Sequence, residues 1–244
     1  MSKLFSIITA SYNNKDSLLE TIVNVYNQKF DNYEHIIIDN CSSDGTKEII
    51  EKFMKDNPNN QISFFQEKDE GIYDAFNKGI KKANGEYISF LGCGDKYSEN
   101  ILSIVAKKIE QNVDASIFYG IVDITDSTKH YYYSRSEDYL LKTGDMMHHS
   151  TCFVKKIDYE EINYFDTKYR SAGDLDAFIK LCLKQKKFYF IPQVISIFQE
   201  GGISTSSSKA TTERIEILRK YDIISKKKYR NYRIKKIIKR FIGK

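Results

Sequence analysis

Short apolar runs alternate with helical periodicity through the first 112 residues of the chain. The runs are rich in β-forming residues, as expected of buried strands. Between them, apolar residues recur every three or four positions, which predicts amphipathic helices. The predicted strands are 4–10, 33–39, 62–66 and 87–91, and the predicted helices are 17–28, 46–55, 73–83 and 98–111. This order predicts an α/β fold with a Rossmann-like, mostly parallel sheet and helices on both faces.

The alternation becomes less regular after residue 112. Strand-like segments at 115–124 and 151–154 precede a helical pattern at 173–185. There is no Pro-rich linker and no internal repeat that would divide the chain. Such irregularity suits a region that shapes itself around a variable substrate.

Composition places the chain among ordinary globular proteins, since 41% of its 244 residues are apolar and 29% are charged. The longest segment without Asp, Glu, Lys or Arg is 188–199, shorter than the ~20 apolar residues that a membrane-spanning helix needs. The four cysteines lie far apart without a C-x-x-C pair, which argues against a zinc site or a disulfide framework. We therefore expect a cytoplasmic protein.

The net charge of +5 is unevenly distributed. Residues 226–244 hold ten Lys and Arg and no acid, so the remaining 225 residues carry a net charge of −5. In a helix, the basic residues would face away from the apolar residues Ile234, Ile237, Ile238, Phe241 and Ile242. Such a helix is suited to the surface of an anionic membrane, whereas the acidic body argues against nucleic acid as a partner.

Polar residues follow the predicted strands. They are Thr9, Ser11, Tyr12 and Asn13 after the first strand, 39–46 after the second, and 92–95 after the fourth. Because the carboxyl ends of parallel strands meet at one edge of an open sheet, these residues are expected to converge on one cleft. Carboxylates can accept hydrogen bonds from a base or ribose and can hold a hard cation. The pattern favours a nucleotide bound with the help of a metal.

Two common nucleotide-binding motifs are absent or broken. No G-x-x-x-x-G-K-[ST] sequence occurs, which argues against a P-loop ATPase. The segment 92–97 partly imitates the dinucleotide fingerprint, but Tyr97 stands where a third glycine would permit close packing of helix on strand. A dehydrogenase is therefore disfavoured.

Four blocks in the same order resemble the family 2 glycosyltransferases. They read FSIITASYN at 5–13, IIIDNCSSDGT at 36–46, DEGIYDAFNKG at 69–79 and GEYISFLGCGD at 85–95. The resemblance is closest to the branch that acts in bacterial capsule, colanic acid and O-antigen synthesis. It implies a GT-A fold, a nucleotide-diphosphate sugar donor, a divalent cation (Mg²⁺ or Mn²⁺) and inversion at the anomeric carbon. Residues 1–112 would form the donor half, 113–208 the acceptor half and 209–244 a basic helical tail.

The resemblance also implies the residues that bind the donor. Asp39 corresponds to the acid that reads the nucleobase, and Thr9 and Tyr12 to positions that line the same pocket. Asp44, Asp69 and Asn77 belong to the second and third blocks. Three of these have structural alternatives, because Asp39 could be a turn residue at the end of a strand, Asp44 could simply cap the following helix and Asn77 could simply orient a loop.

The metal-binding motif of the family is usually Asp-x-Asp, and the corresponding residues here are Cys93, Gly94 and Asp95. The resemblance therefore implies Asp95 as the metal ligand, with Gly94 beside it in the donor site. One carboxylate, two diphosphate oxygens and waters can complete the octahedral coordination of Mg²⁺ or Mn²⁺.

The catalytic base of the family is the second acid of a pair at a helix start. Here the pair is Gly173 and Asp174, so the resemblance implies Asp174 as the base. Asp176 lies about 200° further around a helix and cannot share its face.

Two further segments match the family more weakly. His148 corresponds to a histidine of the cleft, with a hydrogen-bonded structural histidine as the alternative. In an extended segment His148 and His149 would point to opposite faces and could not bind one metal together. The stretch 201–205, with Ser204 and Thr205, is expected to close over the diphosphate as a mobile loop, or else to be a solvated linker.

We therefore expect an inverting, metal-assisted hexosyl- or hexosaminyltransferase. It would extend a lipid-linked saccharide at the cytoplasmic face of the membrane, with a UDP-sugar favoured by analogy. A sugar-nucleotide pyrophosphorylase is an alternative, but residues 4–14 lack the Gly-rich, Lys/Arg-bearing signature it would need. A non-catalytic binding subunit is a second alternative, suggested by Cys93 and Gly173 where the family has acids.

Overall fold

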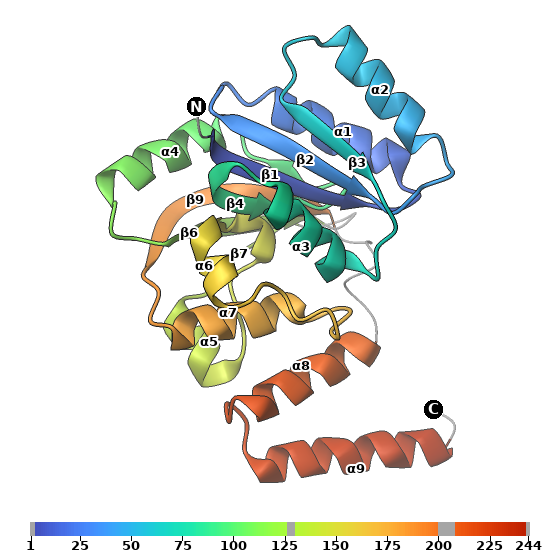
Figure 1. The fold of residues 1–244 in the computed structure, drawn as a ribbon. Helices are drawn as coiled ribbons and strands as arrows, with labels where there is room; N and C mark the ends of the chain where they lie inside the picture. Colours follow the sequence, from blue (N-terminus) through green and yellow to red (C-terminus); the bar gives the residue numbers. More distant parts are fainter. Residues whose placement is uncertain (1–2, 126–129, 200–207, 243–244) are drawn as a thin grey trace.

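The computed structural model describes residues 3–125, 130–199 and 208–242. In the first half, strands and helices alternate as predicted (Figure 1). The elements are β1 (Lys3–Ser11), α1 (Lys15–Tyr26), β2 (Tyr33–Asp39), α2 (Thr46–Asp56), β3 (Ile62–Gln66), α3 (Ile72–Lys82), β4 (Gly85–Phe90), β5 (Lys96–Tyr97) and α4 (Ile101–Gln111).

The second half is a mixture of shorter elements and one long strand. It contains β6 (Ile117–Thr125), β7 (His130–Tyr133), α5 (Glu137–Thr143), a 3-10 turn (His149–Thr151), β8 (Phe153–Lys155), α6 (Lys156–Glu161), α7 (Gly173–Leu183), β9 (Phe188–Gln199), α8 (Ser208–Lys220) and α9 (Lys226–Ile242). The strand predicted at 151–154 therefore begins at Phe153, because a 3-10 turn occupies the preceding residues. The uncharged segment 188–199 is β9.

All these strands join one sheet in the order β3-β2-β1-β4-β8-β6-β9-β5, with β7 paired to β6. The strands β1 to β4 pair in parallel, and β8 joins β4 and β6 in antiparallel fashion. β6 and β9 are parallel, with a register shift near Gly120, where a Cβ would lie 2.8 Å from the carbonyl oxygens of Ile191 and Gln193. The predicted α/β fold with a mixed, largely parallel sheet is confirmed.

Helices cover both faces of the sheet because successive strand residues point to opposite sides. On β1, Ile8 packs with α3, α6 and α7, and Ile7 packs on the other face, which α4 covers. α1 and α2 enclose a third cluster around Ile37. Figure 1 shows α8 and α9 beyond α7, on the side of the molecule away from α1 and α2. The predicted C-terminal helix is present as α9.

Candidate functional site

Hydrogen bonds draw together the loops at the carboxyl edge of the sheet. The N–H of Asn13, after β1, donates to Ser42 Oγ, after β2, at 2.8 Å. The thiol of Cys93, after β4, donates to the carbonyl oxygen of Ala10 at 3.3 Å. These hydrogen bonds therefore join the loops after β1, β2 and β4, where the sequence predicts the donor site.

Asp39, the last residue of β2, has no exposed surface. Its carboxylate accepts hydrogen bonds from the N–H and hydroxyl of Ser42, at 2.8 and 2.5 Å, and from Nε2 of Gln66 at 3.1 Å. Sequence reasoning had not singled out Ser42 or Gln66 as partners. Because the Asp39 carboxylate has no exposed surface, a nucleobase could reach it only if a neighbour such as Ser42 or Gln66 moves.

Thr9 and Tyr12, predicted to line one pocket, lie in different surroundings. Thr9 is fully buried, and its Oγ1 lies 2.9 Å from Nε2 of His35 within the sheet. Tyr12, just beyond β1, is 60% exposed. The Thr9 side chain bonds to a neighbouring strand and, like Asp39, has no exposed surface, so its place in the donor pocket stays a prediction.

Asp44 and Asp69 both bond to backbone N–H groups near helix starts. Asp44 accepts from the N–H of Lys15 at 3.0 Å and from that of Thr46 at 3.2 Å, the first residues of α1 and α2. A hydrogen bond from the Thr46 hydroxyl lowers the pKa of Asp44. Asp69 accepts from the N–H of Gly71 at 2.8 Å, and burial raises its pKa. For Asp44, the helix-capping alternative describes its contacts.

Asn77, in α3, pairs with the backbone of Phe165 in the loop before α7. Its Nδ2 donates to the Phe165 carbonyl oxygen at 2.9 Å, and its Oδ1 accepts from the Phe165 N–H at 3.0 Å. Both polar ends of the amide are thereby occupied. Asn77 orients a loop, as the structural alternative stated.

The 92–95 turn holds the predicted metal ligand. Gly94 has φ +93°, a conformation that favours glycine, and its N–H donates to the Ser17 carbonyl oxygen at 3.0 Å. Asp95 is nearly buried and accepts from the N–H of Gly92 at 3.2 Å. Burial raises the pKa of the Cys93 thiol to about 12, so Cys93 is a neutral thiol rather than a metal-binding thiolate.

The metal ligand that this turn offers, the Asp95 carboxylate, suits a hard cation whose other ligands come from elsewhere. Within the described ranges, no three His, Cys, Asp or Glu side chains are grouped so that they could hold a metal. A single carboxylate such as Asp95 suits Mg²⁺ or Mn²⁺ only when substrate phosphates and waters complete the coordination.

Asp174 lies in the first turn of α7, and the residue is partly exposed. Its Oδ1 accepts hydrogen bonds from the hydroxyl of Tyr73 at 3.1 Å and the N–H of Leu175 at 2.9 Å. Burial raises the pKa of Asp174, and these two hydrogen bonds oppose the rise. Tyr73 was missed in the sequence because its position in the α3 pattern marks it only as a core residue.

Contacts of the third sequence block, 69–79, connect Asp174 to the loops at the carboxyl edge of the sheet. Asp69 lies shortly before α3, and its N–H donates to Oδ1 of Asn40, in the loop after β2, at 2.9 Å. Tyr73 follows in the first turn of α3 and reaches Asp174. The candidate base thus lies next to the loops of the predicted donor site.

Asp176 is fully buried in an ion-pair network between α7 and α8. Its carboxylate lies 2.7 Å from Nζ of Lys180 and 2.8 Å from Nζ of Lys220, and it accepts from the Tyr221 hydroxyl at 2.9 Å. Burial works to raise its pKa, but the hydrogen bonds from Lys180 and Lys220 outweigh it and lower the pKa. Only Asp174 of the two acids is left for a substrate.

His148 and His149 point into different surroundings. Nδ1 of His148 lies 2.8 Å from Oγ of Ser150, and its ring lies against Phe198. The His149 ring stacks on Phe90 at 4.8 Å between centroids, and its Nε2 is buried without a hydrogen-bond partner in the described structure. Burial lowers the pKa to about 4 for His148 and to about 3 for His149, so both are neutral at pH 7.

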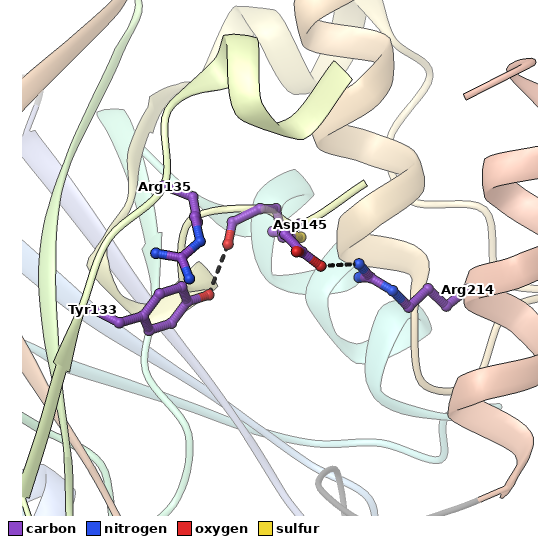
Figure 2. Close-up of a pocket in the computed structure, with 5 residues that line it drawn as sticks. Tyr133, Arg135, Asp145 and Arg214 are labelled. Carbon is purple, nitrogen blue, oxygen red and sulfur yellow. Dashed lines mark hydrogen bonds and ion pairs between the residues drawn. The ribbon is translucent and has the colours of Figure 1, made fainter. Parts of the chain in front are cut away.

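A pocket of about 350 Å³ lies near His148 (Figure 2). Its lining residues are Tyr133, Arg135, Asp145, Met146 and Arg214. Figure 2 shows Arg214 paired with Asp145, and the Tyr133 hydroxyl donating to the Met146 carbonyl oxygen at 2.7 Å. The guanidinium of Arg135 lies over the rings of Tyr133 and Tyr139, at 5.0 and 5.2 Å.

The pocket carries net positive charge, and one of its lining residues, Tyr133, lies beside His148. Two arginines and one aspartate line it, and no acid pairs with Arg135 in the described part of the chain. The Tyr133 ring lies edge-on to the His148 ring at 6.5 Å, and the Asp174 charge opposes the lowering of the His148 pKa by burial. Sequence reasoning missed this pocket. The expected loop 201–205, with Ser204 and Thr205, lies outside the described residues.

A family comparison decides the assignment, because the model of glycosyl transferase family 2 matches residues 6–181. The chain belongs to this family. The glycosyltransferase TuaG of Bacillus subtilis (strain 168), whose name assigns it to teichuronic acid biosynthesis, is 27% identical over 216 residues. That match covers 84% of this chain and 82% of TuaG.

Solved structures share the fold. TarS 1–349 of S. aureus, in complex with UDP-GlcNAc, aligns with a TM-score of 0.72 and 19% identity, over 89% of this chain and 65% of that one. The mannosyltransferase PcManGT of Pyrobaculum calidifontis, in complex with GDP-Man and Mn²⁺, aligns with a TM-score of 0.69 and 16% identity, over 93% and 66%. This family 2 member therefore has the fold of known glycosyltransferases, as the sequence blocks predicted.

Proposed function

We propose that this family 2 protein is an inverting glycosyltransferase that moves a hexosyl or hexosaminyl group from a UDP-sugar to a hydroxyl of a lipid-linked saccharide. The observation that carries the proposal is Asp174, a carboxylate with one oxygen held by the protein and the other without a hydrogen bond to any described residue. Teichuronic acid, in the name of TuaG, supports a role in bacterial surface polysaccharide synthesis.

The reaction is a single displacement. The acceptor hydroxyl oxygen attacks C1 of the donor sugar, the bond between C1 and the diphosphate oxygen breaks, and the acceptor proton passes to Oδ2 of Asp174. The nucleoside diphosphate leaves on the opposite side, so the configuration at C1 inverts. Both products then dissociate and Asp174 loses its proton to water.

Donor binding is assigned to residues 1–112. Tyr12 offers an exposed ring to the nucleobase, and Asp39 reads the base after exchanging one of its present partners. Asp95 would hold Mg²⁺ or Mn²⁺, which when bound offsets charge on the diphosphate. The Mn²⁺ in the PcManGT complex supports a divalent cation, and the UDP-GlcNAc in the TarS complex supports a UDP-sugar.

Acceptor binding is assigned to residues 113–208, with the pocket at Arg135 as its centre. An arginine held between two aromatic rings and without an acidic partner favours an acceptor that carries negative charge, such as the diphosphate of a lipid-linked saccharide. The tail, residues 209–244, would hold this site at the cytoplasmic face of the membrane.

The non-catalytic alternative loses much of its basis at Gly173. A Cβ at this position would lie 2.8 Å from Cδ2 of Tyr73, so the Tyr73 ring occupies the space where another side chain would begin. Glycine at position 173 therefore leaves room for the Tyr73 ring, whose hydroxyl bonds to Asp174.

Asp174→Asn tests the proposal. The amide keeps the shape and can still accept from Tyr73 and Leu175, but it cannot take a proton. We expect transfer to fall by ~10³-fold while donor-induced thermal stabilisation stays within experimental error of the wild type. Transfer within about tenfold of wild type would contradict the assignment. A thermal-shift panel of UDP-, GDP-, CDP- and dTDP-sugars with and without Mn²⁺ identifies the donor.

A further inference from the structure

Tyr73 is fixed so that its hydroxyl points at one oxygen of Asp174. Its ring is almost fully buried, stacks on Phe165 at 5.4 Å between centroids and meets Phe76 edge-on at 6.1 Å. The hydroxyl donates to Oδ1 of Asp174 at 3.1 Å. A ring packed on two sides cannot swing away, so this hydrogen bond restricts the rotation of the Asp174 carboxylate.

The two carboxylate oxygens of Asp174 have different surroundings. Oδ1 receives both the Tyr73 hydroxyl and the Leu175 N–H, and among the residues that the structure describes Oδ2 receives no hydrogen bond. An oxygen that already accepts two hydrogen bonds is a poor place for a further proton. The geometry therefore distinguishes an anchored oxygen from a reactive one.

Gly173 makes this arrangement possible. A Cβ there would lie 2.8 Å from Cδ2, 2.9 Å from Cε2 and 3.0 Å from Cγ of Tyr73, closer than real Cβ contacts. Any side chain at position 173 would push against the ring that carries the hydroxyl. Tyr73 and Gly173 are thus sterically coupled although one hundred positions separate them.

We propose that Tyr73 is a positioning residue that anchors Oδ1 of Asp174 and leaves Oδ2 to take the acceptor proton, and that Gly173 is required to make room for it. The proposal rests on the assignment of Asp174 as the base. It also explains why glycine precedes the base in this chain. Tyr73 itself remains protonated, because burial and the neighbouring Asp174 charge raise its pKa well above 10.

Tyr73→Phe removes the hydroxyl and keeps the packed ring. We expect kcat for UDP release from UDP-GlcNAc, or from the UDP-sugar that the panel selects, to fall about tenfold with an unchanged donor KM. The acid limb of the kcat profile should move up by about one pH unit, because a hydrogen bond to the ionised carboxylate is lost and its pKa rises.

Tyr159→Phe is the matched control. Tyr159 is fully buried in the same aromatic cluster, against Phe165, and its hydroxyl has no hydrogen-bond partner in the described structure. Its removal should leave kcat and the pH profile as in the wild type. Equal losses in the two variants would show a general packing effect and overturn the proposal.

Gly173→Ala tests the steric coupling. Alone, it should displace the Tyr73 hydroxyl and reproduce the kcat loss and the shifted acid limb of Tyr73→Phe. Added to Tyr73→Phe, it should lower kcat little further, because no hydroxyl remains to displace. A full additional loss in the double variant would overturn the role of Gly173.

The outcomes separate this inference from the proposed function. If Asp174→Asn is inactive and Tyr73→Phe has the kcat and pH profile of the wild type, Tyr73 is not a positioning residue and Asp174 remains the base. If Asp174→Asn is active, the proposed function is wrong, and the positioning role fails with it.

Discussion

The aspartates of the candidate site differ in what their oxygens already bind. Asp44 bonds to the N–H groups that begin α1 and α2, and Asp39 bonds to Ser42 and Gln66. These contacts fix the loops around the donor edge. At Asp174 only Oδ1 accepts hydrogen bonds from the described residues, so carboxylates of the same type differ in what they leave for a substrate.

The 92–95 turn gives a residue-scale prediction about metal binding. Asp95→Ala should abolish the Mn²⁺-dependent part of the stabilisation by a UDP-sugar, because a hard cation prefers carboxylate oxygen. Cys93→Ala should retain that part, because the Cys93 thiol is neutral and bonds to the Ala10 carbonyl oxygen. Thermal shifts with and without Mn²⁺ measure both. Equal loss in the two variants would mean that the turn is purely structural.

At the scale of elements, α8 holds the start of α7. The Glu213 carboxylate accepts hydrogen bonds from the N–H groups of Arg170, Ser171 and Ala172, at 2.8 to 3.1 Å, just before α7 begins. One turn further along α7, Asp176 pairs with Lys220 of α8. The helix that carries Asp174 is therefore held at its first turn by contacts of two other acidic side chains, Glu213 and Asp176.

Hydrophobic periodicity predicted the first half well. The strands β1 to β4 and the helices between them are regular, and each buries apolar residues at the spacing typical of its type. The strand-end residues followed from parallel topology. Tyr73, Glu213 and Arg135 could not be found in this way, since each acts through a partner far along the chain or through a surface built by several loops. Sequence position alone likewise did not show that Thr9 is buried and bonds to His35.

Asp176→Asn tests the junction of α7 and α8. It leaves Lys180 and Lys220 without their buried counter-charge. We expect the free energy of unfolding to fall by about 3 kcal/mol. This is the low end of the range for buried ion pairs, because both lysines are partly exposed to water. The folded-state pKa of Asp176 is lowered, so its contribution is complete above the unfolded pKa of about 3.9 and disappears as pH falls below it. Urea denaturation at pH 7 and pH 3 should show the gap between variant and wild type narrowing at pH 3. A constant gap would contradict this account.

At the scale of the whole molecule, α9 extends the body with a strongly basic surface. Lys226, Lys227, Lys228 and Arg230 are exposed, and Ile234 is 47% exposed. Tyr232 ties the helix to α8 through Thr212, at 3.0 Å between the hydroxyl oxygens. None of the helices in the described ranges has the length and apolar character to cross a bilayer. Figure 1 shows α9 at the periphery of the molecule, next to α8.

Membrane attachment through α9 gives the last prediction. Deleting 226–244 should release the protein from liposomes that contain anionic lipid and reduce transfer to a lipid-linked acceptor, with donor hydrolysis unchanged. Because the deletion also exposes part of α8, a variant with Lys226, Lys227, Lys228 and Arg230 changed to Gln keeps the helix and tests charge alone. At ~1 kcal/mol for each basic residue near the surface, its binding should weaken by about two to three orders of magnitude. High salt should mimic it on the wild type. Unchanged co-sedimentation of both variants would show that the tail has another role. Co-sedimentation lost only in the deletion would assign the attachment to residues 231–244, with their six remaining basic residues and their apolar residues.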